Sequence, residues 1–238
     1  MAQPGKVYLI PTVLSADTLH TIPAYITPVV KQISVFFVEN ERTARRYLKA
    51  LDRSINIDEL QLLLMSEHQS PDTSLAKQIL LSGKDIGVIS EAGCPAIADP
   101  GHRVVQVAHA IDAQVIPMVG PNSMLLALMA SGMNGQNFQF VGYLPVKPPE
   151  RVKAIRDLEM QSLKKRQTQL FIETPYRNNH VFKDILNNCK DDTQVCVAAD
   201  ITGPEEFIRT KTVKEWKQQI PELHKKPAIF LLMAQGGS

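Results

Sequence analysis

The sequence has few cysteines and none of the histidine spacings that bind metal ions. Its three cysteines, Cys94, Cys189 and Cys196, form no CxxC pair, which excludes a zinc knuckle and a disulfide framework. The six histidines never fall at HxxxH or HExxH spacing, so we expect no catalytic metal. No apolar run is long enough to cross a bilayer, and the N-terminus has no signal-peptide pattern. We therefore expect a cytoplasmic protein without a membrane partner.

Three glycine-based fingerprints are also absent. The chain has no GxGxxG after its first apolar run, no GxxxxGK[ST] and no GxSxG. These absences exclude the usual dinucleotide site, the P-loop and the hydrolase nucleophile elbow. The formal net charge of +2 over 238 residues is too small to indicate nucleic acid by itself.

Short apolar runs alternate with amphipathic segments along most of the chain. In the first half we expect strands at 6–12, 33–39, 60–66, 85–90 and 113–118, with helices between them. A restart follows at residues 119–123, and the tail from 205 is more typical of antiparallel strands around a short helix. Such alternation predicts an α/β protein with mainly parallel sheets. We divide it into two lobes, 1–118 and 119–238.

Several predicted strands end in an acid. These acids are Glu39, Glu91, Glu173 and Asp200. Each one alone is explained equally well as a cap at the positive end of the next helix. Because ligands collect beyond the carboxyl ends of parallel strands, the four together indicate a site suited to ribose hydroxyls, an amine or a cation.

The segment "SEAGCPAIADPG" at 90–101 is longer than a strand-to-helix connection requires. Ala92 and Gly93 carry little or no side chain, so a ligand could approach the backbone closely. Pro95 and Pro100 stiffen the segment and reduce the ordering entropy lost on binding. A rigid helix entry with Asp99 as its cap explains "ADPG" well and "SEAGCP" poorly.

This segment resembles the Ser-Asp-Ala-Gly-x-Pro-x-Ile-Ser-Asp-Pro-Gly loop of the tetrapyrrole methylase family. Members of that family are class III S-adenosylmethionine-dependent methyltransferases. The similarity is closest to the branch that methylates a cytidine 2′-hydroxyl of small-subunit ribosomal RNA. Further motifs agree in order: "ENERTARRYL", "SEHQ", "VGPNS", "GYLPVK" and "FIETPYR". The resemblance covers nearly the whole chain, although the small C-terminal domain of longer members has no counterpart in it.

The resemblance implies the tetrapyrrole methylase fold, a homodimer, and S-adenosylmethionine in a cleft between the two lobes. Carried over residue by residue, the implied cofactor contacts are Pro11, Thr12, Gly93, Cys94, Ile97, Ser123, Met124, Ile172, Glu173, Pro227 and Ala228. Glu39, Arg42, Glu67 and His68 fall in the substrate-side motifs. We take Glu39, Arg42 and His68 as catalytic candidates, with Glu39 or His68 as proton acceptor; His68 alone is explained as well by a cap or surface role.

Three segments depart from the branch. "IPTVLSAD" lacks the glycine of its first loop, Glu39–Arg42 reads Glu-Asn-Glu-Arg in place of Glu-Asp-Thr-Arg, and "AADITGPEE" replaces Arg-Glu-Leu-Thr-Lys. These departures concern the substrate and leave the methyltransferase assignment intact. The resemblance predicts ribose 2′-O-methylation of 16S ribosomal RNA. Two alternatives remain open: a methyltransferase of the same family with another acceptor, such as a tetrapyrrole or other small molecule, and a diverged cofactor-binding protein without turnover.

An RNA partner requires a surface that faces phosphates. A basic run follows "GYLP" and comprises Lys147, Arg151, Lys153, Arg156, Lys164, Lys165 and Arg166. A second group, Arg45, Arg46 and Lys49, lies on the helix after Glu39. Such groups would make binding strongly salt-dependent, although a charged helix is more often only a solvated face.

Overall fold

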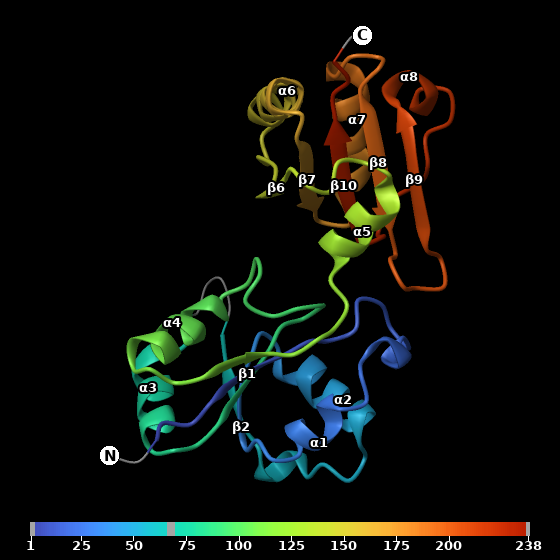
Figure 1. Cartoon of the computed structure of the whole chain (residues 1–238). Helices are drawn as coiled ribbons and strands as arrows, with labels where there is room; N and C mark the ends of the chain where they lie inside the picture. The colour runs from blue at the N-terminus through green and yellow to red at the C-terminus, as the bar shows by residue number, and fades with distance from the viewer. Residues whose placement is uncertain (1–2, 66–69, 237–238) are drawn as a thin grey trace. The chain divides into compact units, whose positions relative to one another are not determined.

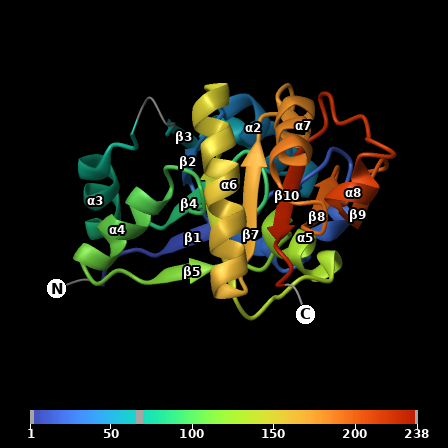
Figure 2. The same ribbon diagram turned by 90° about the horizontal axis from the view of Figure 1, so that it is seen from above.

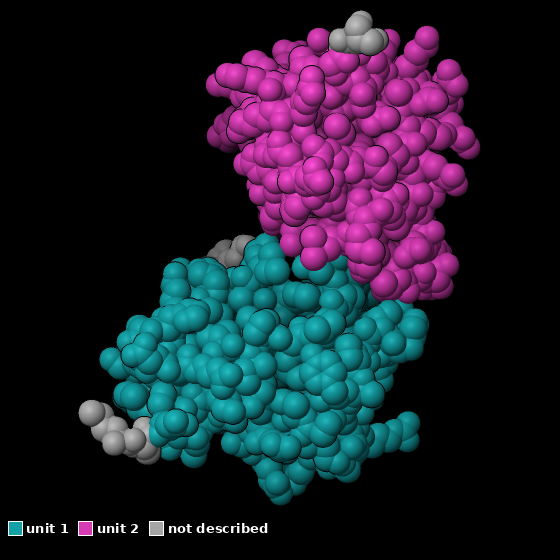
Figure 3. All heavy atoms as spheres, in the orientation of Figure 1, with its two compact units in different colours: residues 1–122 teal, residues 123–238 magenta. Residues whose placement is uncertain are grey.

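The computed structural model describes residues 3–65 and 70–236, and the chain forms two compact units, Met1–Asn122 and Ser123–Ser238 (Figure 3). The division proposed from the sequence, 1–118 and 119–238, stays a prediction. The description below follows the two units, each by itself.

Unit 1 is built on a parallel sheet. Its strands are β1 (Val7–Ile10), β2 (Val35–Val38), β3 (Gln61–Leu64), β4 (Ile86–Ile89) and β5 (Val115–Pro117), in the order β3-β2-β4-β1-β5 (Figure 2). All neighbouring pairs in this order are parallel. Every residue of β2 and β4 is buried, as expected for central strands covered on both faces. Because the strands are parallel, their carboxyl ends share one edge.

Helices cover both faces of this sheet. They are α1 (Ile26–Val30), α2 (Glu41–Leu51), α3 (Thr73–Leu81) and α4 (His102–Ala110), with 3-10 turns at Leu19–Thr21 and Ile57–Glu59. Phe36 packs in the cluster with α1 and α2, and Phe37 in the cluster with α3 and α4, because successive strand residues point to opposite faces. The helices α3 and α4 lie side by side in both views (Figure 1 and Figure 2).

Unit 2 has a mixed sheet. Its strands are β6 (Phe138–Tyr143), β7 (Thr168–Glu173), β8 (Gln194–Ala199), β9 (Phe207–Thr212) and β10 (Ala228–Met233), in the order β6-β7-β10-β8-β9. The pair β6 and β7 is parallel, and the other neighbouring pairs are antiparallel. The α/β class and the parallel sheet of unit 1 are confirmed, and β9 and β10 are the antiparallel strands expected in the tail from 205, but the sheet of unit 2 as a whole is mixed and not mainly parallel. The reason is that β10, the last strand, runs between β7 and β8 in the opposite direction.

The helices of unit 2 are α5 (Ser123–Ser131), α6 (Pro148–Lys165), α7 (Asn178–Asn188) and α8 (Val213–Trp216). One large core joins α6, α7 and α8 to the sheet, with Phe182 stacked on Phe230 and edge-on to Trp216. The crossovers through α6 and α7 make β6, β7 and β8 run in the same direction. Figure 1 shows α5 on the opposite side of the sheet from α7.

Candidate functional site

The loops after β1 and β4 are joined at the carboxyl edge of unit 1. The backbone N–H of Thr12 donates to the Gly93 carbonyl at 2.9 Å, and the Thr12 hydroxyl donates to the Ser90 carbonyl at 3.3 Å. Thr12 and Gly93 form an isolated antiparallel bridge. The structure therefore brings together Pro11, Thr12 and Gly93, which the family resemblance assigns to one cofactor site.

Gly93 and Gly120 allow the loop after β5 to lie close to the loops after β1 and β4. Gly93 has φ +73°, and a Cβ there would lie 3.1 Å from Leu14 Cδ2 and 3.3 Å from the Pro121 oxygen. A Cβ at Gly120 would lie 2.2 Å from Pro11 Cβ, closer than atoms pack. The close packing of the chain on itself accounts for Gly93, where the sequence had suggested only room for a ligand. Sequence reasoning missed Gly120, although it stands in the quoted "VGPNS".

A buried hydrogen bond fixes the first loop. The Tyr47 hydroxyl, from the inner face of α2, donates to the Pro11 carbonyl at 2.6 Å. Burial raises the pKa of Tyr47 far above its ordinary value, so the phenol keeps its proton and remains a donor. Sequence reasoning missed Tyr47, and the polar tip of a tyrosine on the apolar face of a helix is the signal that could have marked it.

The other loop residues differ in exposure. The Cys94 thiol is half-buried, 3.5 Å from the Pro121 carbonyl, and burial raises its pKa, which keeps it in the weakly nucleophilic thiol form. Ile97 is 47% exposed and is thus open to a ligand. Asp99 accepts the Gly101 N–H at 2.7 Å, which is the helix-entry role considered for it.

The four acids expected at one sheet edge are divided between the two units, with Glu39 and Glu91 after β2 and β4 of unit 1 and Glu173 and Asp200 at the ends of β7 and β8 of unit 2. A Glu39 carboxylate oxygen accepts the N–H of Glu91 at 2.6 Å, and the Thr43 hydroxyl donates to the Glu91 carboxylate. Arg42 has an exposed side chain in the first turn of α2, and its N–H is capped by Asn40 at 2.9 Å. Glu39 is half-exposed and stands beside this turn. His68, and Glu67 of the same motif, lie outside the described residues.

In unit 2, four predicted contacts fall on one strip where β7 ends and β10 begins. Glu173 pairs with Ala228 and Ile172 with Ile229 across the antiparallel ladder. Pro227 precedes β10, and its carbonyl accepts the Asp200 N–H at 2.9 Å. Ser123 and Met124, the remaining predicted contacts, are the first residues of α5.

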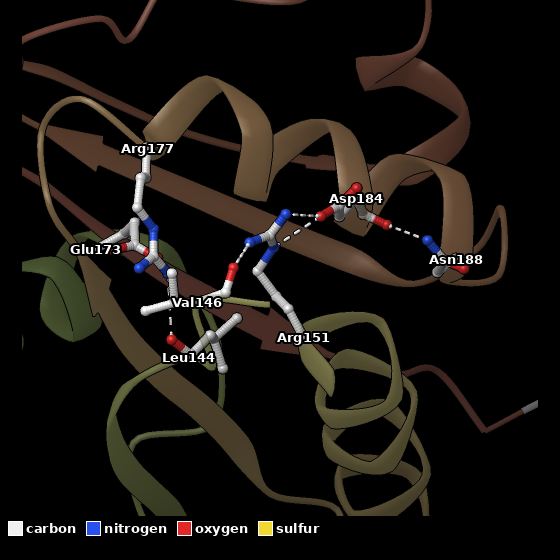
Figure 4. Close-up of polar contacts among 7 residues, drawn as sticks. All are labelled: Leu144, Val146, Arg151, Glu173, Arg177, Asp184 and Asn188. Carbon is white, nitrogen blue, oxygen red and sulfur yellow. Dashed lines mark hydrogen bonds and ion pairs between the residues drawn. The ribbon is translucent and has the colours of Figure 1, made fainter. Parts of the chain in front are cut away.

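The Glu173 carboxylate is committed to the protein. Its side chain is 0% exposed, and Arg177 Nη2 lies 2.5 Å from one oxygen while the Thr174 N–H donates to the other at 2.7 Å. Arg177 also donates to the Leu144 carbonyl at 3.3 Å (Figure 4). Glu173 therefore anchors the turn after β7, and its backbone, together with that of Ile172, is what a ligand could contact.

The basic run expected to face RNA loses one member. Arg151 is buried, with two guanidinium nitrogens each 2.7 Å from an Asp184 carboxylate oxygen and a third bond to the Val146 carbonyl at 2.8 Å (Figure 4). It ties α6 to α7 and is not a phosphate contact, which corrects the expectation. Side chains that stay exposed on or just after α6 are Lys153, Arg156, Lys164, Lys165 and Arg166.

Within the described ranges, no helix has the length and apolarity to cross a membrane. The same residues include no group of three His, Cys, Asp or Glu side chains arranged to hold a metal ion.

Comparison with known proteins places this architecture in a methyltransferase class. A family model described as "Tetrapyrrole (Corrin/Porphyrin) Methylases" matches residues 25–217. The chain belongs to this family of methyltransferases.

Its curated relatives carry a narrower name. "Ribosomal RNA small subunit methyltransferase I" of Streptococcus pyogenes serotype M6 is 30% identical over 237 residues, covering 97% of this chain and 76% of the relative. The protein of the same name from Bacillus subtilis is 33% identical over 213 residues, covering 86% of this chain and 67% of the relative. The crystal structure of the methyltransferase CobJ shares the fold, with a TM-score of 0.63, 14% identity, and coverage of 98% and 97% of the two chains.

Proposed function

We propose that this protein transfers a methyl group from S-adenosylmethionine to a ribose 2′-hydroxyl of small-subunit (16S) ribosomal RNA. The observation that carries the proposal is the joined pair of loops held by Thr12 and Gly93, with the acids Glu39 and Glu91 beside them. The names of the relatives support small-subunit ribosomal RNA as the acceptor, since these proteins are 27% to 33% identical to this chain over 86% to 97% of its length.

Each unit supplies a set of proposed cofactor contacts. In unit 1 these are Pro11, Thr12, Gly93, Cys94 and Ile97, and the fit rests on a cradle of backbone held rigid by the Tyr47 and Thr12 hydrogen bonds. In unit 2 they are Ser123, Met124, Ile172, Glu173, Pro227 and Ala228. Backbone carbonyl and N–H groups can form hydrogen bonds with the polar groups of the cofactor.

Methyl transfer requires the acceptor hydroxyl to be aligned with the methyl group and to lose its proton. When bound, the cofactor supplies a methyl group already activated on a sulfonium, so correct placement of the acceptor provides much of the rate. Glu39 is the proposed acceptor of the hydroxyl proton. The Glu91 N–H at 2.6 Å fixes the direction of its carboxylate. The exposed Arg42 guanidinium is proposed to bind a phosphate of the RNA and so to hold the acceptor ribose in place.

The RNA partner is proposed to contact exposed basic side chains. In unit 1 the exposed face of α2 carries Arg42, Arg45, Arg46 and Lys49. Of these, Arg45 also forms an ion pair with Glu41, with Nη2 and Oε2 3.3 Å apart. In unit 2 the exposed residues of α6 form a second basic group. Binding through such groups releases counterions and weakens steeply as salt rises. A homodimer in the cytoplasm is part of the same proposal and derives from the family.

Glu39→Gln tests the proposal without removing the side chain. We expect calorimetric affinity for S-adenosylmethionine to stay within about 2-fold and methyl transfer to small ribosomal subunits to fall about 100-fold or more. Glu59→Gln, at an exposed glutamate in a 3-10 turn of the same unit, is the control and should leave both unchanged. Cofactor binding without transfer to ribosomal RNA by the wild-type protein would point to another acceptor. Absence of binding by a folded wild-type protein would reject the enzyme.

A further inference from the structure

Two turns of unit 2 are bonded to each other beside the strip formed by the end of β7 and the start of β10. The Lys225 N–H donates to the Pro175 carbonyl at 3.0 Å. The buried Asn178 amide donates to the Lys226 carbonyl at 2.6 Å, and the Leu223 N–H donates to the Asn179 side chain at 2.9 Å. The turn at 222–226 is thus fixed onto the first residues of α7.

Each turn presents one ring to solvent, and the rings touch. Tyr176 and His224 meet edge to face, with ring centroids 5.8 Å apart and planes at 73°. Tyr176 nevertheless remains 66% exposed, and His224 is exposed as well. Hydrogen bonds of Lys225, Asn178 and Leu223 already hold the two turns together. The exposed tyrosine ring therefore contributes little to folding and is accessible to a ligand.

The turn at 222–226 also carries charged side chains. Glu222 accepts the His224 N–H at 2.7 Å and an amide N–H of Asn179, and Lys226 is paired with Glu205 at 2.8 Å. Lys226 and Glu205 neutralise one another, whereas Glu222 is held by hydrogen bonds and keeps its negative charge. Lys225, next to His224 in the chain, has an exposed side chain and a backbone fixed at φ 63°. The surface therefore exposes the Tyr176 and His224 rings, with Lys225 next to His224 in the chain.

We propose that Tyr176, His224 and Lys225 form a platform on which one base of single-stranded RNA stacks while Lys225 meets the adjoining phosphate. Unpaired RNA bases bind proteins by stacking on Tyr and His rings, and basic side chains next to them bind the backbone. The platform rests on the proposed RNA acceptor. It lies next in the chain to the proposed cofactor contacts, since Tyr176 follows Glu173 by three residues and Lys225 precedes Pro227 by two. A nucleotide beside the methylated one is the fitting occupant.

The test measures binding of a fluorescently labelled single-stranded oligoribonucleotide to the full chain by anisotropy. Tyr176→Ala should weaken RNA binding about 5- to 100-fold, the range for loss of one stacked base. Tyr176→Phe keeps the ring and should stay within about 2-fold. Lys225→Gln should reduce the slope of log affinity against log salt by about one. Phe138→Ala, at an aromatic side chain of unit 2 that is 42% exposed on β6, is the matched control and should change neither quantity.

Thermal unfolding and S-adenosylmethionine titration of the same variants separate the possible failures. Unchanged values for both, with weakened RNA binding, support the platform. Equal RNA affinity of Tyr176→Ala and wild type overturns the platform and leaves the proposed function standing if methyl transfer persists. Weakened cofactor binding with unchanged RNA binding also overturns it. Wild-type protein that binds no RNA overturns both proposals. Where Tyr176→Ala lowers the unfolding temperature, His224→Ala provides the same test from the other turn.

Discussion

Gly120 and Pro11 touch at a position that only glycine fits. A Cβ atom at residue 120 would lie 2.2 Å from Pro11 Cβ and 2.3 Å from Pro11 Cγ. The contact brings the loop after β5 against the loop after β1, which is itself bridged to the loop after β4 by Thr12 and Gly93. Three loops at one sheet edge therefore depend on one another for their shape.

Gly120→Ala should disturb this edge without affecting the rest of the unit. The added methyl group must displace Pro11, and such overpacking costs about 1–3 kcal/mol of unfolding free energy. We expect affinity for S-adenosylmethionine to fall at least about 10-fold, measured by calorimetry. Gly135→Ala is the control, since a Cβ there has nothing within 4 Å. Wild-type affinity of Gly120→Ala would contradict a cofactor site at this edge.

Tyr47→Phe should loosen the loop after β1. It removes the donor 2.6 Å from the Pro11 carbonyl and leaves that buried carbonyl unpaired, which costs about 1–3 kcal/mol. Denaturant unfolding measures the loss, and cofactor titration should show weaker binding in the same variant. Stability and affinity equal to those of the wild type would mean that the bond does not position Pro11.

Arg177→Met should destabilise unit 2 strongly. It leaves the fully buried Glu173 carboxylate without its cation, and removal of one partner from a buried pair costs about 3–5 kcal/mol. The double variant Glu173→Gln with Arg177→Met should recover much of the loss in urea unfolding. Arg45→Ala breaks a largely exposed pair and should cost under about 1 kcal/mol. A similar loss for the single and double variants would show that charge burial is not the cause.

Asp99 should make the stability of unit 1 depend on pH. Burial raises the pKa of its carboxyl group, so the protonated form is favoured in the folded state. Its contribution to stability is therefore full below the ordinary pKa of Asp, about 3.9, and is lost as pH rises through the higher folded value. Asp99→Asn cannot ionise, so the wild type should lose stability relative to this variant over that window. Urea unfolding at several pH values checks this, and a constant difference would exclude the effect.

The sequence supported the order of elements because apolar runs and amphipathic segments are local patterns. The acids Glu39 and Glu91 meet as expected, because β2 and β4 are parallel neighbours. The antiparallel strands of the tail from 205 were indicated by the sequence, but the place of β10 in the sheet had no comparable signal. This place results from the pairing of β10 with β7 through Ala228 and Glu173, residues far apart in the chain. Local periodicity contains no information on such a pairing.

Two side chains show the same limit at the candidate site. The burial of Arg151 depends on Asp184, which α7 brings to it, and within a basic helix nothing distinguishes it from its exposed neighbours. Gly93 reads as bare backbone for a ligand, whereas its nearest neighbours are Leu14 and Pro121 of its own unit. A missing side chain indicates a close approach, but the sequence does not say which atoms approach.

The most direct measurement is methyl transfer followed by identification of the labelled nucleoside. Purified protein is incubated with S-adenosylmethionine carrying a tritiated methyl group and with small ribosomal subunits, and the RNA is digested to nucleosides and separated. The account predicts label in a 2′-O-methylated nucleoside with wild-type protein, and its loss with Glu39→Gln. Label on a base, or none in RNA while the folded protein binds the cofactor, would contradict it.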